Sequence, residues 1–205
     1  MAYIVNPTPT DLSGESHLCS YLRESIWLNT DGPERYLLPK PYEYADIAVE
    51  ERDPRTLFPT ATYVLKSHLA MLLVLEKLLK QYGLDIFDIR GMVCLGDENQ
   101  IICPPIIEVW NQIPHEFDGR EVIVDGLHRN YLARKRGRKI TCVVISGRIS
   151  SDLPVMPLTW NYVREQDTVP KDKRVYVRGI PTPWKHYELY RVSFPGSTGP
   201  RAIAT

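Results

Sequence analysis

The chain has 205 residues and a mass of 23.6 kDa, and its 25 Lys and Arg balance 25 Asp and Glu. This length allows one domain with a substantial core and excludes a large multidomain assembly. Apolar residues at 43% and charged residues at 24% exclude a disordered or collagen-like chain. The longest apolar run, Leu69 to Leu75, is far shorter than the roughly 20 residues that cross a bilayer, and no secretory pattern opens the sequence. We therefore expect a cytoplasmic protein with no membrane partner.

The first 58 residues are rich in proline, tyrosine and acids and show little sustained periodicity, which predicts an N-terminal extension. The strongest helical pattern follows, with apolar residues from Val64 to Leu79 and a stop at Gly83. Its apolar face is broad, so we expect this helix to be largely buried, with Glu76 near its rim. Two strands are predicted next, over 91–95 and 100–110, the second interrupted by Pro104-Pro105.

The middle of the chain predicts a compact unit of strand, tight turn, helix and returning strand. The strand covers 121–124, the helix 127–136 and the second strand 139–146. We expect a core over 59–150 and a C-terminal extension over 151–205, which includes a short helix from Thr182 to Arg191.

The segment Val122 to Arg129, with the sequence VIVDGLHR, is the most informative about chemistry. A buried strand ends there, Gly126 allows a sharp turn, and a helix begins with His128 and Arg129 in its first turn. Free N–H groups at a helix start already carry partial positive charge, so adding bases works against helix stability. This pattern favours a bound anion, most simply a phosphate, with Asp125 holding a metal ion or orienting a reacting group. The alternative is that Asp125 only caps the helix and Arg129 forms a surface ion pair.

Pro104-Pro105-Ile106-Ile107, the VIVDGLHR segment, Ala133, Gly137 and the strand ITCVVI together resemble the ParB/sulfiredoxin superfamily. This group includes the N-terminal domain of ParB partition proteins, the sulfiredoxins, the free-serine kinases and the DGQHR-type proteins. The resemblance covers roughly Thr62 to Ser146 and implies an α+β fold, a small mixed sheet with helices, flanked here by the two extensions. It defines the fold better than the function, since these relatives perform different chemistry on one nucleotide cradle.

The resemblance also implies roles for individual residues. Gly126, His128 and Arg129 would face nucleotide phosphates, assisted by Lys66 and Ser67 at the start of the preceding helix. The serine kinases place an aspartate and a histidine at Asp125 and His128 in their catalytic centre. They also use a glutamate ahead of the first helix, where this chain has no acid, so Glu108 is our candidate for that role. Sulfiredoxins carry their reactive cysteine at the position of Leu127, so sulfiredoxin activity is not expected.

Two functions follow from this site. The first is a nucleotide-dependent phosphotransferase, a kinase-like enzyme that acts on a small hydroxyl-bearing molecule with ATP or ADP and Mg²⁺. Asp125, His128 and Glu108 would be catalytic, and Asp125 would bind the metal. The second is a ParB- or DGQHR-like switch module that binds a nucleotide (ATP, ADP or CTP) or DNA without small-molecule turnover.

Other charged segments offer weaker candidates. His115, Glu116 and Asp118 share a loop and could ligate a metal with His128, although the spacing matches no known pattern. The basic run over 134–139 could contact nucleic acid, although cations are also typical of a helix C-terminus. The four cysteines form no CxxC pair, which favours reduced, buried thiols.

Overall fold

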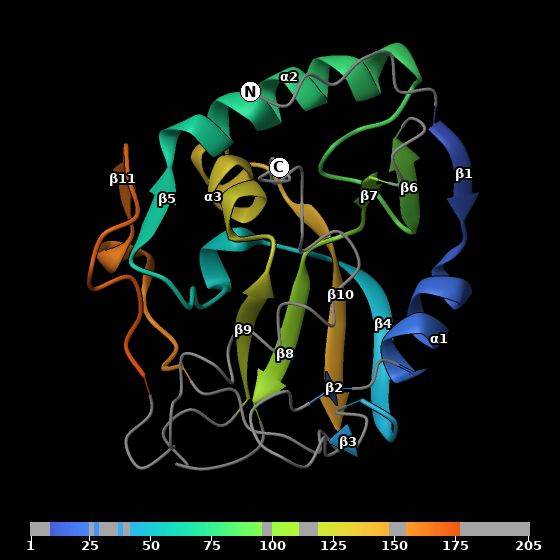
Figure 1. The fold of residues 1–205 in the computed structure, drawn as a ribbon, viewed down its shortest axis with the longest axis horizontal. Coiled ribbons are helices and arrows are strands. Elements are labelled where there is room, and N and C mark those ends of the chain that lie inside the picture. The colour runs from blue at the N-terminus through green and yellow to red at the C-terminus, as the bar shows by residue number, and fades with distance from the viewer. Residues whose placement is uncertain are drawn as a thin grey trace.

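The fold is α+β, as the sequence predicts, and is built around a four-stranded mixed sheet (Figure 1). The computed structural model describes residues 9–24, 27–28, 37–38, 42–95, 100–110, 119–147 and 155–176. The strands of the main sheet lie in the order β4 (Ala45–Arg52), β10 (Ile140–Gly147), β8 (Ile106–Trp110) and β9 (Arg120–Asp125). β10 runs antiparallel to β4 and parallel to β8, while β8 and β9 are antiparallel.

The edge strand β4 belongs to the segment that the sequence predicts to be an extension. It pairs with β10 over its whole length, from Ala45 opposite Gly147 to Arg52 opposite Ile140. The sheet is therefore not contained within 59–150. Periodicity did not reveal this strand because its outer positions carry acids and Arg52, which is typical of an edge strand.

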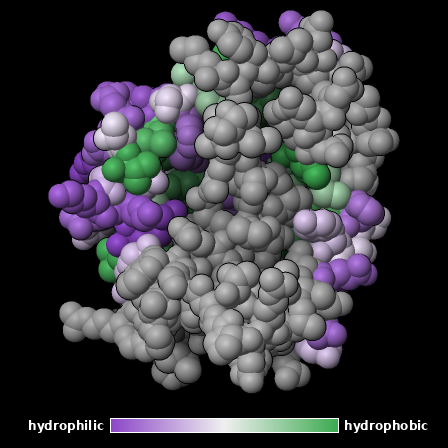
Figure 2. All heavy atoms as spheres, viewed as in Figure 1, coloured by the Kyte–Doolittle hydropathy of each residue, from purple (hydrophilic) through white to green (hydrophobic). Residues whose placement is uncertain are grey.

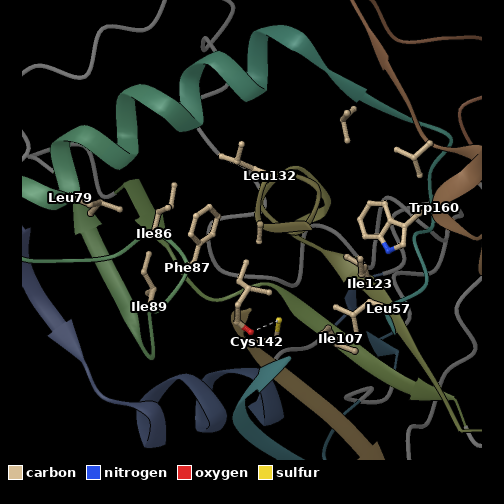
Figure 3. Close-up of a cluster of buried hydrophobic side chains, with 14 of the residues drawn as sticks. Leu57, Leu79, Ile86, Phe87, Ile89, Ile107, Ile123, Leu132, Cys142 and Trp160 are labelled. Carbon is tan, nitrogen blue, oxygen red and sulfur yellow. Dashed lines mark hydrogen bonds between the residues drawn. The ribbon is translucent and has the colours of Figure 1, made fainter. Parts of the chain in front are cut away.

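Helices cover the two faces of the sheet. α1 (Glu15–Glu24) packs Leu18 and Leu22 into one hydrophobic cluster with Ile106 and Val143. The opposite face carries a second cluster beneath α2 (Lys66–Gln81) and α3 (Leu127–Lys135), shown in Figure 3. Successive side chains of a strand point to opposite faces of the sheet, so Ile106 joins the first cluster and its neighbour Ile107 joins the second.

Three smaller sheets complete the fold. In the first, β6 (Met92–Leu95) lies between β1 (Pro9–Ser13) and β7 (Gln100–Ile102). In the second, β5 (Tyr63–Leu65) pairs in parallel with β11 (Arg164–Gln166). In the third, β2 (Trp27–Leu28) pairs with β3 (Leu37–Leu38). The predicted strand over 100–110 is broken at Cys103–Pro105, because proline has no N–H to donate to a neighbouring strand. The two pieces, β7 and β8, belong to different sheets. Among the described residues, the short 3-10 helices η1 (Pro54–Thr56) and η3 (Trp160–Tyr162) lie in the connections.

The prediction that α2 is largely buried is wrong. Only Glu76 and Leu79 of this helix are buried, while Met71, Leu73 and Val74 are 40%, 40% and 59% exposed. α2 crosses above α3 instead of lying on the sheet, so only one side of it contacts the core (Figure 1). The apolar run from Leu69 to Leu75 passes around the whole helix, and one contact side cannot cover it. Within the described residues, no helix combines the length and hydropathy needed to span a bilayer.

Candidate functional site

The turn between β9 and α3 is tightly constrained. Gly126 has φ +81° and ψ 23°, a left-handed conformation that favours glycine. Pro105 packs against it so closely that a Cβ on Gly126 would lie 2.6 Å from the Pro105 Cβ. The backbone N–H and the side-chain Nδ2 of Asn130 both donate to the Gly126 carbonyl, at 3.1 and 3.2 Å. The Pro-Pro step and the Asp-Gly turn, about 20 residues apart in sequence, thus form one structural unit.

The starts of α2 and α3 meet at His128. Its Nε2 accepts a hydrogen bond of 2.9 Å from the backbone N–H of Leu65, the residue that precedes α2. Its ring also lies 4.8 Å from the ring of His68, measured between centroids. Because Nε2 accepts, the proton of a neutral His128 is on Nδ1, which is then a donor. This contact brings Lys66 and Ser67 to the same end of the molecule as Gly126 and His128.

Both helix starts are electropositive. Neither α2 nor α3 has a side chain that caps its first turn, and neither has an acid there. The first N–H groups of a helix have no partner within the helix, so each start carries partial positive charge. Lys66 in α2 and His128 and Arg129 in α3 add to it. Such a place favours an anion over a cation.

Arg129 is buried and forms no ion pair with the part of the chain that the structure describes. Its side chain is turned inward, and the residue is only 8% exposed. Nη2 donates to the carbonyl of Cys103, whereas Nη1 is buried and has no hydrogen-bond partner among the described residues. A buried guanidinium normally pairs with a carboxylate or another anion, because removing its charge from water is costly. The inward position rules out the surface ion pair considered for this residue from sequence.

The two candidate acids lie in different surroundings. Asp125 is half-buried at the end of β9, next to the turn. Glu108 is 1% exposed and accepts a hydrogen bond of 2.5 Å from the hydroxyl of Tyr42, which belongs to the cluster beneath α1. Glu108 therefore points inward and away from α3. The structure brings together Lys66, Ser67, Asp125, Gly126, His128 and Arg129, but it does not bring Glu108 to them.

The basic run over 134–139, which spans the end of α3, contacts other parts of the chain. Arg134 lies over the ring of Trp160, 5.4 Å from its centroid. The other four cations have carboxylate partners, namely Lys135 with Glu165, Arg136 with Glu76, Arg138 with Asp85 and Lys139 with Glu51. These contacts favour the structural interpretation of the run over a nucleic-acid surface.

The thiol of Cys103, whose carbonyl accepts a hydrogen bond from Arg129, is not activated. Burial raises the pKa of Cys103 to about 12, although Arg129 acts in the opposite direction. A thiol with such a pKa is protonated at neutral pH and is a poor nucleophile. This agrees with the absence of a cysteine at Leu127 in the position of the sulfiredoxin nucleophile.

The described residues contain no group of three His, Cys, Asp or Glu side chains that could hold a metal ion. The loop with His115, Glu116 and Asp118 lies outside the described residues, as does the predicted helix over 182–191. Sequence reasoning also missed several residues around the site. Asn130, which holds the turn, and Asp167, which contacts Lys66, had no local signal because their partners are defined only by the fold.

Comparison with known proteins agrees with this geometry. The ParB CE domain family matches residues 37–166, which is more than half of the chain and includes β4, both site helices and β11. The chain therefore belongs to the ParB CE domain family. Searches of curated proteins and of solved structures found no match.

Proposed function

We propose that this protein is a nucleotide-binding module of the ParB kind, which holds the phosphates of a nucleotide where the starts of α2 and α3 meet. The observation that carries the proposal is the buried Arg129, whose Nη1 has no partner and which forms no ion pair in the described structure. A phosphate oxygen is the type of acceptor that such a guanidinium binds best.

Three further groups support a phosphate at this place. The first turn of α3 has no acid and no side-chain cap, so it favours an anion, and the His128 imidazole lies at the same helix start. Lys66 contributes a mobile positive charge, since its side chain is 53% exposed. These groups recognise phosphate and carry no information on the base, so ATP, ADP and CTP are all candidate ligands.

Asp125 is suited to assist a magnesium ion. Mg²⁺ usually keeps several waters and binds one or two carboxylates together with substrate phosphates. Asp125 is the carboxylate next to the turn, and it is half-buried, so it remains accessible to such an ion. When bound, the ion would neutralise phosphate charge, and Asp125 would hold and orient it.

We favour binding without turnover over phosphoryl transfer to a small molecule. Transfer needs a residue that positions the attacking hydroxyl beside the phosphates. Glu108, the candidate for that role, faces Tyr42 beneath α1, on the other side of the sheet from α3. Membership of the ParB CE domain family supports a nucleotide- or DNA-binding module better than it supports an enzyme, and kinase activity stays a prediction.

Calorimetric titration of the full chain with ATP, ADP and CTP, with and without Mg²⁺, tests the proposal. We expect binding of at least one nucleotide, and its loss in Arg129→Ala. Because Arg129 is buried, Lys66→Gln serves as a second variant with an exposed side chain, and it should weaken binding. Arg138→Gln is the matched control, since Arg138 pairs with Asp85 outside the site. No binding of any nucleotide would overturn the proposal, and a salt-sensitive DNA complex formed without nucleotide would replace it.

A further inference from the structure

A loop over residues 164–173 is closed at its base by a single residue, Thr62. The Thr62 carbonyl accepts from the N–H of Arg164 at 2.9 Å, and its own N–H donates to the carbonyl of Lys173 at 3.1 Å. The Thr62 hydroxyl also donates to the carbonyl of Asp172, at 2.9 Å. The loop therefore has the closed ends and surface position of an Ω-loop. Figure 2 shows hydrophilic side chains gathered over this side of the molecule, where β5 and β11 lie.

The pairing register carries this loop to the start of α2. β11 runs parallel to β5, with Arg164 opposite Tyr63 and Gln166 opposite Leu65. One residue further along each strand, Asp167 lies beside Lys66, and the distance from its Oδ2 to the Lys66 Nζ is 3.0 Å.

A second carboxylate of the loop contacts the other helix of the site. Glu165 accepts hydrogen bonds from the Tyr131 hydroxyl at 3.0 Å and from the Lys135 Nζ at 2.7 Å. The loop thus holds one acid on α2 and one on α3. Since α2 has no acid in its own first turn, Asp167 supplies negative charge there from outside the helix.

We propose that the 164–173 loop is a lid in which Asp167 occupies Lys66 until a nucleotide phosphate displaces it. This inference rests on the proposed function, because it assigns a regulatory contact to the same site. The Asp167 and Lys66 side chains are 79% and 53% exposed. An exposed pair of this kind is weak and screened by water, so a doubly charged phosphate competes for Lys66 readily. The loop lowers nucleotide affinity without blocking binding.

Titration calorimetry of the full chain with ATP and with inorganic tripolyphosphate tests the lid. Asp167→Asn should tighten binding of both ligands by roughly two- to fivefold, the range expected for an exposed ion pair. Asp172→Asn is the matched control, because it removes the same charge from the same loop, and it should leave the affinity unchanged. Lys66→Gln should weaken binding, and adding Asp167→Asn to it should give no further gain.

The outcomes separate the lid from the function on which it rests. If the wild type binds nucleotide and Asp167→Asn behaves like Asp172→Asn, the lid is wrong while the proposed function stands. If Asp167→Asn tightens binding equally in the wild type and in Lys66→Gln, the lid is also wrong. The gain would then come from the change in net charge and not from the release of Lys66. If no variant binds either ligand, both proposals fail.

Discussion

Pro105 and Gly126 lie so close that no side chain fits between them, since a Cβ on Gly126 would approach the Pro105 Cβ to 2.6 Å and its Cα to 2.9 Å. This contact fixes the turn that begins α3, because Pro105 is rigid and Gly126 adopts a left-handed conformation. The two halves of the sequence motif are thus joined by packing, and the position of the candidate site depends on that packing.

Gly126→Ala should destabilise the fold. The left-handed backbone costs an L-residue about 1–2 kcal/mol, and the clash with Pro105 adds about 1–3 kcal/mol. Gly137→Ala is the matched control, because Gly137 also has positive φ, +62°, but a Cβ there would meet nothing within 4 Å. Urea unfolding of both variants measures the difference. Equal losses of stability would show that the contact with Pro105 does not constrain the turn.

Glu76 should make the stability of the fold sensitive to acid. Burial alone raises the pKa of this carboxyl, but hydrogen bonds from Arg136 and Lys80 outweigh it, so its pKa in the folded state is lowered. The ionised form therefore stabilises the fold above the ordinary glutamate pKa of about 4.5, and this stabilisation is lost as the pH falls through the lowered value.

Glu76→Gln tests this dependence. At pH 7 we expect the variant to lose about 1.5–3 kcal/mol of its free energy of unfolding, because it breaks hydrogen bonds to a buried charged group. The difference in the free energy of unfolding between variant and wild type should shrink as the pH falls below about 4.5. Glu51→Gln is the control, since Glu51 and Lys139 are 55% and 65% exposed and their pair should contribute little. A difference that stays constant down to pH 3 would contradict the role given to ionised Glu76.

The thiols of Cys103 and Cys142 should be inert in the folded protein. Burial raises the pKa of each to about 12, in both cases against the effect of Arg129. At pH 8 we expect no alkylation of either residue by iodoacetamide until the chain is unfolded in guanidinium. Peptide mapping by mass spectrometry distinguishes them from the other cysteines. Labelling of Cys103 in the folded state would contradict the burial to which we attribute its raised pKa.

The turn and its helix could be predicted from sequence because their signals are local. Asp125-Gly126 follows a run of β-branched residues, and Gly137 ends the helix, so strand, turn and helix can each be read within a few residues. The predicted strands over 91–95 and 100–110 are likewise close in sequence, and they pair as β6 and β7 with Leu95 opposite Gln100.

Other features depend on partners that are distant in sequence. β4 could not be recognised as a sheet strand, because its pairing with β10 joins segments about 90 residues apart. The orientation of Glu108 could not be predicted, because its hydrogen bond with Tyr42 joins residues that are distant in sequence. Arg129 could be recognised as a candidate site residue but not as buried, because its contact with the Cys103 carbonyl depends on how the Pro-Pro step folds. The exposed face of α2 was missed because an apolar run does not reveal how much of a helix the core covers.

The most direct measurement is a crystal structure of the full chain grown with a non-hydrolysable ATP or CTP analogue and Mg²⁺. We expect phosphate oxygens to accept hydrogen bonds from the Arg129 Nη1 and from N–H groups in the first turn of α3, with the ion on Asp125. A nucleotide bound away from these groups, or an Arg129 Nη1 that is sealed under packed side chains at saturating nucleotide, would contradict the proposed site.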